Sequence, residues 1–242
     1  GDDHLCPSYN ILGHGPPGGY AEFVAAPARN AHPMPLGLSF EQAASIPLTF
    51  LTAWHMLVGR AGLKAGEDVL VLAAGSGVGT AAIQIAKLLG ARVIATASTD
   101  AKLEKAADLG ADDTINYTAE PQFHKLVRRL TGGKGVAVVV EHVGAATWDG
   151  SVASLARNGR LVTCGATTGY EAKIDLRHLF YKHLSLLGSF MGRHDELVRL
   201  LPFFEDGRLK PVVDRVLPLD RAAEAHRLMG DRAQFGKLVL TP

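Results

Sequence analysis

A glycine-rich turn between a β-branched segment and a helix-like segment is the part of the sequence best suited to hold a ligand. The turn is Ala74-Gly-Ser-Gly-Val-Gly79; it follows Val69–Ala73 and leads into Val78–Leu89. A helix N-terminus offers free N–H groups and a positive dipole end to a phosphate, and glycines let the backbone approach a pyrophosphate. The residues that we expect to bind a dinucleotide here are Ser76, Gly77, Val78 and Gly79.

The spacing of the glycines departs from the usual dinucleotide pattern. If the pattern starts at Gly75, Thr80 replaces the third glycine; if it ends at Gly79, Ala74 and Ser76 replace the first two. A plain tight turn is therefore the alternative interpretation. The strand before the turn and the helix after it favour a dinucleotide.

The residues after the next β-branched segment bear on which nucleotide is bound. An NAD enzyme usually carries an acidic residue there that binds the ribose hydroxyls, but this sequence has Ala97. Ser98, Thr99 and Lys102 follow and suit a 2′-phosphate, so NADP(H) is favoured. Asp100 keeps NAD(H) open. In the simpler alternative, Ser98 caps a helix and Lys102 is a solvated surface lysine.

The elements that must position these residues alternate between strand-like and helix-like segments from Glu67 onward, which predicts βαβ units. The expected strands are Val69–Ala73, Arg92–Thr96, Thr114–Tyr117, Ala137–Glu141, Arg160–Cys164 and Leu184–Ser189. The expected helices are Val78–Leu89, Asp100–Leu109, Pro121–Leu130, Thr147–Ala156 and Leu176–His183. Strands that are apolar without alternation indicate a sheet covered on both faces. The expected fold class is α/β, with a doubly wound parallel sheet of the Rossmann type.

The two ends of the chain break this alternation. Residues 1–38 are rich in Gly, Pro and His, and we expect loops with a short strand over Tyr20–Ala25. After Gly188, the pattern predicts further helices and strands: Asp195–Glu205 and Asp220–Met229 as helices, Val212–Leu217 and Lys237–Thr241 as strands.

Composition excludes several classes of protein. Lys and Arg number 25 against 24 Asp and Glu, so net charge gives no reason to bind nucleic acid or an anionic membrane. Hydrophobic residues make up 47% of the chain, which excludes disorder as its main state. Only Cys6 and Cys164 are present, and no signal peptide is visible, so a cytoplasmic location is expected.

Several motifs in a fixed order resemble the medium-chain dehydrogenase/reductase superfamily, which includes zinc alcohol dehydrogenases and NADPH quinone reductases. The matching motifs span essentially the whole chain: Gly19-Tyr-Ala-Glu-Phe23, Ala43–Trp54, Ala74–Gly79 with Ala82-Ile-Gln-Ile-Ala-Lys87, Leu109-Gly-Ala-Asp112, Ile115-Asn-Tyr117, Gly159-Arg-Leu-Val162 and Phe235-Gly-Lys-Leu-Val-Leu240.

The resemblance implies a division into three parts. Residues 1–38 would be the tail of a GroES-like β-rich catalytic domain, 39–190 the Rossmann nucleotide-binding domain, and 191–242 a return to the catalytic domain. On this basis we expect that a stretch of about 100 residues, the size of a small domain, precedes Gly1 and that the chain is a fragment. The strand near Leu184–Phe190 resembles the edge through which family members form dimers or tetramers, and pairing would cover that edge.

The resemblance also implies roles for individual residues. Ser98, Lys102 and Tyr117 match positions that hold the 2′-phosphate, and Thr52 matches a residue near the nicotinamide that we take as the catalytic candidate. Lys237 matches a residue on the rim of the cofactor. The segments that match the lining of the nicotinamide are Gly165-Ala166-Thr167 and Gly188-Ser189-Phe190-Met191.

Zinc is the uncertain element of this resemblance. Cys6 matches the last cysteine of a four-cysteine structural zinc site, which would need three further thiolates; a free thiol is the alternative. Leu48 and Thr49 stand where the third catalytic-zinc ligand is expected, so a catalytic zinc is doubtful. His55 is explained most simply by helix packing, Cys164 is expected to be a buried small residue, and His142 is a candidate neighbour of the cofactor.

Three functions remain. The first is an NAD(P)H-dependent oxidoreductase that transfers hydride between nicotinamide and a carbonyl, quinone or activated alkene. The second is a zinc-dependent alcohol dehydrogenase whose ligands lie ahead of Gly1. The third is a non-catalytic NADPH-binding protein, since a fold does not fix a function. The expected partner is a small-molecule substrate.

Overall fold

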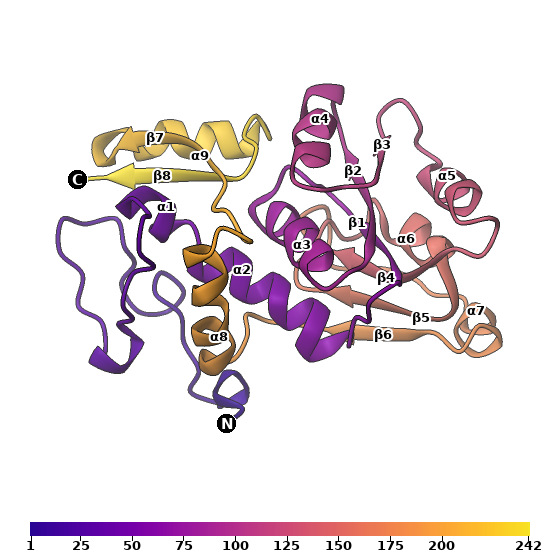
Figure 1. Cartoon of the computed structure of the whole chain (residues 1–242), viewed down its shortest axis with the longest axis horizontal. Coiled ribbons are helices and arrows are strands. Elements are labelled where there is room, and N and C mark those ends of the chain that lie inside the picture. The colour runs from indigo at the N-terminus through magenta and orange to yellow at the C-terminus, as the bar shows by residue number, and fades with distance from the viewer.

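A six-stranded, fully parallel sheet forms one part of the molecule (Figure 1). The computed structural model describes all of residues 1–242. The strands lie in the order β3-β2-β1-β4-β5-β6, so the chain starts in the middle, moves outward to β3 and then crosses to β4 on the other side. This is the strand order of a doubly wound dinucleotide-binding sheet, and the predicted fold class is confirmed. The strands are β1 (Asp68–Val71), β2 (Arg92–Ala97), β3 (Asp113–Asn116), β4 (Val136–Glu141), β5 (Leu155–Thr163) and β6 (Ser185–Gly188).

Helices cover both faces of this sheet and create two separate hydrophobic clusters. Along β1, Val69 and Val71 face one cluster, and Leu70 faces the other. This alternation of two buried faces explains why the strands are apolar at successive positions. Helices α2 (Pro47–Trp54), α3 (Gly77–Leu88), α4 (Asp100–Asp108) and α8 (His194–Glu205) contribute to the first cluster, while α5 (Phe123–Leu130), α6 (Trp148–Ser154) and α7 (Leu176–Tyr181) contribute to the second.

Among the strands of the large sheet, the expected and observed bounds differ most at β5. We expected this strand to start at Arg160, but it starts at Leu155. Helix α6 therefore ends at Ser154, two residues earlier than predicted. The early part pairs Leu155 with Val136, and the register then shifts before Val138 pairs with Arg160. Pairing with a neighbouring strand, which sequence periodicity does not report, therefore decides this boundary.

The remaining elements gather beside the sheet (Figure 1). Strands β7 (Val213–Pro218) and β8 (Lys237–Thr241) form a two-stranded parallel sheet with α9 (Ala222–Gly230) between them in sequence. The short helix α1 (Phe40–Ala44) packs on β7 and β8, so segments from both ends of the chain lie together. Helix α2 continues without a break into a π-helical turn, His55–Arg60.

The strand expected over Tyr20–Ala25 does not form. No other strand of the chain pairs with this segment, and Phe23 is 90% exposed. Residues 1–38 contain two short 3₁₀ turns, Asp3–Leu5 and Ala28–Asn30, and one isolated antiparallel bridge between Ile11 and His14. A strand needs a hydrogen-bonding neighbour, and this segment has none, so the prediction of a strand here is wrong.

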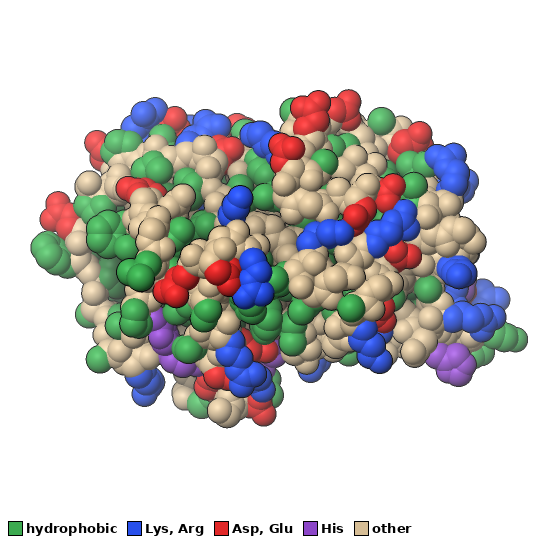
Figure 2. Space-filling model, viewed as in Figure 1, with side chains coloured by type: hydrophobic (Ala, Val, Ile, Leu, Met, Phe, Trp, Pro, Cys, Tyr) green, Lys and Arg blue, Asp and Glu red, His purple; other side chains and the backbone are tan.

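The surface carries charges of both signs. On the face drawn in Figure 2, Lys and Arg side chains are interspersed with Asp and Glu, without a large field of one sign. None of the helices has both the length and the apolar composition required to cross a bilayer.

Candidate functional site

The glycine-rich turn lies where β1 passes into α3, at the carboxyl end of the sheet. The neighbours of β1 are β2 on one side and β4 on the other, so this is the point at which the chain switches direction across the sheet. Ligands of open α/β sheets bind in the crevice at such a point. Ser76 is the N-cap of α3, and its Oγ accepts the Gly79 N–H at 2.9 Å. One of the free N–H groups of the helix is thereby satisfied, while Gly77 and Val78 begin the helix behind the cap.

Close packing shows which form of the glycine pattern applies. A Cβ on Gly79 would lie 2.4 Å from the Ala73 carbonyl oxygen and 2.9 Å from Ala74 Cα, so only glycine fits there. This is the role of the third glycine of the dinucleotide pattern, which brings helix and strand together. The pattern therefore ends at Gly79, and Ser76 stands at its second position as a helix cap.

A lysine from the far end of the chain lies over the same turn. A Cβ on Gly77 would lie 2.8 Å from Lys237 Cδ and 2.6 Å from Thr49 Cγ2, so side chains of β8 and α2 both close on the helix start. Lys237 makes no ion pair with any carboxylate, and burial lowers the pKa of its ammonium. An unpaired, partly buried cation beside a helix N-terminus is suited to an anion.

The exit of β4 approaches the turn from the other side. His142 Nε2 lies 2.8 Å from Ser76 Oγ, and the His142 carbonyl accepts the Thr167 hydroxyl at 3.0 Å. A Cβ on Gly165 would lie 3.2 Å from the same carbonyl oxygen, so the Gly165–Thr167 turn packs directly on His142. The structure thus brings the predicted phosphate and nicotinamide segments to one place.

Sequence reasoning missed the residue that shapes this exit. The Glu141 side chain is fully buried and accepts the N–H groups of Val143 at 2.7 Å and Gly144 at 3.1 Å. It also accepts the hydroxyls of Thr147 and Ser151. The sequence did contain a signal for this role of Glu141. An acidic residue ends an apolar strand, and Gly144, Thr147 and Ser151, which can donate hydrogen bonds to it, follow.

The segments predicted to bind the 2′-phosphate lie together at the end of β2, but their polar groups are partly engaged. Thr99, rather than Ser98, caps α4, which corrects the alternative role considered for Ser98. Lys102 lies beside Gly75, and its ammonium donates to the Arg232 carbonyl. Tyr117 packs on the second hydrophobic cluster, and its N–H donates to the Ala97 carbonyl at 3.1 Å. Ala97, at the position where an acidic residue would bind the ribose hydroxyls, is buried.

The segments predicted to line the nicotinamide meet at the ends of β5 and β6. Thr52 is buried on α2, and its hydroxyl faces Met191 Sδ at 3.8 Å. Gly188 ends β6, and its carbonyl accepts Arg60 Nε at 2.8 Å. Ser189 Oγ is buried without a hydrogen-bond partner, while Phe190 is 55% exposed.

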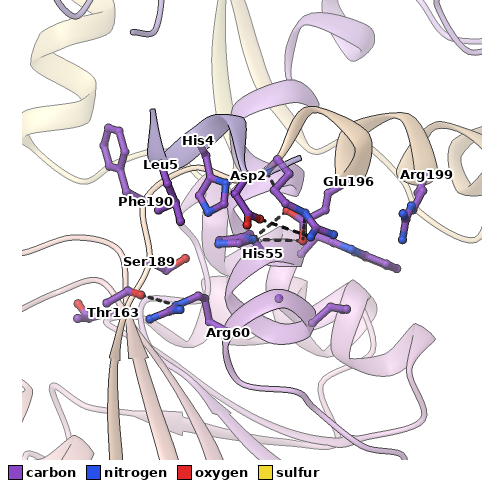
Figure 3. A pocket seen from close by; sticks show the side chains of 15 residues that line it. Asp2, His4, Leu5, His55, Arg60, Thr163, Ser189, Phe190, Glu196 and Arg199 are labelled. Carbon is purple, nitrogen blue, oxygen red and sulfur yellow. Dashed lines mark hydrogen bonds and ion pairs between the residues drawn. The ribbon is translucent and has the colours of Figure 1, made fainter. Parts of the chain in front are cut away.

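A pocket of about 810 Å³ opens next to Gly188–Phe190 (Figure 3). The view places Ser189, Phe190 and Thr163 on one side and Glu196 and Arg199 on the other. His55 lies between them and pairs with Glu196, Nδ1 to Oε2 at 2.9 Å. Glu196 also accepts the Arg193 N–H at 2.8 Å. The buried His55–Glu196 pair therefore lines a cavity beside the predicted nicotinamide wall.

The His55–Glu196 pair has room because two neighbouring residues are glycines. A Cβ on Gly59 would lie 2.6 Å from His55 Nδ1, and one on Gly192 would lie 3.0 Å from Glu196 Oε2. Burial lowers the pKa of His55, although the Glu196 carboxylate acts against that shift. His55 was expected only to pack; it is buried, as packing requires, and in addition joins the π-helical turn after α2 to α8.

The residues of this chain do not assemble a zinc site. No group of three or more His, Cys, Asp and Glu side chains is placed to hold a metal ion. Cys6 is exposed and contacts Ser8 Oγ at 3.1 Å. The Thr49 hydroxyl donates to the Ser45 carbonyl at 2.8 Å. Burial raises the pKa of the Cys164 thiol to about 12, so it remains a protonated, inert thiol at neutral pH.

Curated relatives of the chain are oxidoreductases or larger synthases. Human quinone oxidoreductase is 31% identical over 92% of the chain and 69% of its own length. The spectinabilin polyketide synthase system protein NorB from Streptomyces orinoci is 42% identical over 86% of the chain. The chain spans only 10% of the length of NorB, so it matches one segment of a much longer protein.

Solved structures share the architecture closely. A crystal structure of an NAD-dependent alcohol dehydrogenase superposes with a TM-score of 0.95, at 55% identity, over 99% of the chain and 70% of that protein. The 2-octenoyl-CoA carboxylase reductase CinF, solved with NADP and 2-octenoyl-CoA, gives a TM-score of 0.92 at 34% identity over 99% of the chain and 58% of that protein.

A family model described as zinc-binding dehydrogenase matches residues 77–206, which begin at the first residue of α3 and end one residue beyond α8. The matched region therefore contains five of the six strands of the large sheet, β2 to β6, and the helix that follows the glycine-rich turn. With the relatives and the strand order, the match shows that the chain belongs to the zinc-binding dehydrogenases of the medium-chain dehydrogenase/reductase superfamily.

Proposed function

We propose that the chain forms the nucleotide-binding part of an NAD(P)H-dependent oxidoreductase. The observation that carries this proposal is the start of α3, where a serine caps the helix N-terminus, only glycine fits at position 79, and the side chain of Lys237, whose ammonium has no carboxylate partner, packs on Gly77. This set of groups suits a pyrophosphate. The relatives named above support the same class of activity.

In this function the residues of the chain bind and orient, and the nicotinamide, when bound, supplies or accepts the hydride. The N–H groups at the start of α3 and Lys237 would hold the pyrophosphate. The Gly165–Thr167 and Gly188–Phe190 segments would present one face of the nicotinamide to the substrate. The Thr52 hydroxyl now faces only the weak acceptor Met191 Sδ, so it is free to donate to a substrate oxygen on which charge develops.

We favour NADP(H) as the cofactor. At the end of β2, Ala97 stands where an NAD enzyme usually has an acidic residue. Lys102 lies beside the Ala74–Gly79 turn proposed for the pyrophosphate (the phosphate turn). CinF was solved with NADP. The alternative is NAD(H), because the alcohol dehydrogenase that is 55% identical to the chain is described as NAD-dependent. Asp100 is the acid nearest in sequence, and it accepts Asn116 Nδ2 at 2.7 Å.

For the substrate we propose a quinone, an activated alkene or a carbonyl compound that enters the pocket beside Gly188–Phe190. A pocket of about 810 Å³ is large enough for a small-molecule substrate. A zinc-dependent alcohol dehydrogenase is the second candidate, favoured by the family to which the chain belongs. Because no zinc ligands come together in this chain, we derive no step through a metal.

We further propose that two chains pair through β6. This strand is at the edge of the six-stranded sheet, and an unpaired edge is a ready site for pairing. Both cysteines are free thiols, which suits a reducing compartment, and we propose the cytoplasm.

The experiment that tests this function is a titration of the protein with NADPH and, separately, NADH, followed by nicotinamide fluorescence. Tighter binding of NADPH that is lost in Lys102→Ala would support NADP(H). Equal binding, or tighter NADH, would overturn the NADP(H) preference and turn attention to the alcohol dehydrogenase candidate. Binding without turnover of any quinone, enone or aldehyde would favour a non-catalytic protein. No binding of either nucleotide would refute the proposed function.

A further inference from the structure

His142 contacts the phosphate turn through Ser76, and the function proposed above gives its side chain no role. His142 follows β4 directly, and its Nε2 is 2.8 Å from Ser76 Oγ. Ser76 Oγ in turn accepts the Gly79 N–H at 2.9 Å. The three groups form a chain of hydrogen bonds from the imidazole through the helix cap to the backbone of α3.

We infer that His142 is a positioning residue for the phosphate turn: it accepts the Ser76 hydroxyl hydrogen and so fixes the serine oxygen against the Gly79 N–H. The N–H groups at the start of α3 are then held in the orientation that a pyrophosphate requires. This inference rests on the proposed function, because it names the residue that prepares the same site for its cofactor.

The hydrogens of the three groups support this arrangement. A serine hydroxyl has one hydrogen and two lone pairs. One lone pair takes the Gly79 N–H, and the hydrogen needs an acceptor. Burial lowers the pKa of His142, against the opposing effects of the Glu141 carboxylate and the Ala73 carbonyl, so the ring is neutral at pH 7 and one of its nitrogens accepts. Nε2, at 2.8 Å, is that acceptor.

Packing alone does not account for a histidine at this position. Nδ1 is buried without a hydrogen-bond partner, which costs stability. An apolar side chain of the same size would fill the space without that cost. The polar ring is therefore explained by the 2.8 Å contact of Nε2 with Ser76 Oγ, while the Ala73 carbonyl near the ring opposes the lowering of its pKa.

The backbone of the same residue reaches the other half of the site. The His142 carbonyl accepts the Thr167 hydroxyl at 3.0 Å, and Gly165 packs on that carbonyl. His142 thus joins the turn proposed for the pyrophosphate to the segment proposed for the nicotinamide. Substitution of the His142 ring should change the phosphate turn and leave the Thr167 contact in place, because Thr167 bonds to the backbone carbonyl of His142.

The test compares side chains that keep or lose the acceptor. His142→Leu removes it, His142→Gln can place an amide oxygen near the position of Nε2, and His142→Asn is too short to do so. We expect about tenfold weaker nucleotide binding for His142→Leu and His142→Asn, as for one lost hydrogen bond, and near-normal binding for His142→Gln. His178→Leu, on the exposed face of α7, is the matched control and should bind normally.

A double variant separates this role from general damage. Ser76→Ala and His142→Leu act through one bond, so the double variant should bind about as weakly as the worse single variant. The free energy of unfolding of His142→Leu should stay close to that of the parent protein, because removal of the unpaired buried Nδ1 offsets the loss of the acceptor for the Ser76 hydroxyl. Additive losses of affinity, or failure of His142→Gln to restore binding, would overturn the inference.

A second measurement needs no cofactor. Amide hydrogen exchange at Gly79 reports directly on its bond to Ser76 Oγ. Exchange should become faster in His142→Leu and Ser76→Ala but not in His142→Gln. Unchanged exchange in His142→Leu overturns the inference, even if no nucleotide binds. Failure of the parent protein to bind nucleotide refutes the proposed function instead, so the two failures are distinguishable.

Discussion

The phosphate turn and the pocket beside β6 are built in different ways. The turn is closed mainly within a few residues, by the Ser76 cap on Gly79 and by the contact of Gly79 with Ala73, and side chains from distant segments, such as Lys237 and His142, pack around it. The pocket is lined by segments from Asp2 to Arg199, which include the start of the chain, α2, β6 and α8. Local chain geometry forms the first region, while long-range packing forms the second.

The two regions also differ in their chemistry. The turn presents backbone N–H groups and a cation without a carboxylate partner, so it is suited to a fixed anion. In the pocket, His55 and Glu196 already satisfy each other, and Arg193 is shared among Asp2, Asp195 and Glu196. The Lys237 cation at the turn therefore has no carboxylate partner, whereas His55, Glu196 and Arg193 in the pocket are paired.

The largest effect is expected from Gly79→Ala in the turn. The added Cβ would lie 2.4 Å from a backbone oxygen that cannot move aside, so we expect a loss of about 3 kcal/mol in the free energy of unfolding. Nucleotide binding should be lost with it. Urea denaturation and fluorescence titration measure both. Gly230→Ala, where no atom lies within 4 Å of the new Cβ, is the control, and equal stability of the two variants would contradict the assignment of Gly79.

In the pocket, Glu196→Ala should lower the free energy of unfolding by about 2 kcal/mol, because His55 and the Arg193 N–H lose a buried acceptor. Nucleotide affinity should change much less than stability. The matched control is Glu224→Ala, which removes an ion pair with Arg221 nearer the surface and should cost under about 1 kcal/mol. A large loss of nucleotide affinity with unchanged stability would show that the two regions are not separate.

Lys237→Met should weaken binding of NADPH and NADH by the same factor, about tenfold, because it removes a charge-assisted contact to a phosphate that both nucleotides share. Titration of the two nucleotides checks this. A loss confined to NADPH would place Lys237 at the 2′-phosphate instead of the pyrophosphate.

The smallest effect is expected from pH. Burial lowers the pKa values of His142 and His55 below the 6.5 of a free histidine, so below that pH the folded state binds fewer protons than the unfolded state. The free energy of unfolding should therefore fall as pH drops from 6.5, before the carboxylates titrate. Urea denaturation at pH 7.5 and 5.5 measures the fall. His142→Leu should reduce it, and an unchanged fall in that variant would show that His142 does not contribute.

Much of the site could be predicted because it depends on local chemistry. The Ala74–Gly79 turn, the helix after it and the order of strands and helices were recognisable from residue types alone, and the strand order confirms the fold class. Ser98 and Lys102 were expected near one another because they are close in the chain. Their present partners, such as the Arg232 carbonyl on Lys102, depend on a segment 130 residues away and left no local signal.

By itself, the sequence determined the doubly wound sheet and a helix that begins within the glycine-rich turn, at Val78 in the prediction and at Gly77 in the structure, since periodicity and glycine residues act over a few positions. Only the tertiary structure decided which glycine pattern applies, because the clash at Gly79 involves the strand beside the helix. It also decided that Tyr20–Ala25 is not a strand, that His55 meets Glu196 and that His142 meets Ser76. Those contacts join residues up to 141 positions apart, and a hydrogen bond over such a separation is set by packing of the whole chain.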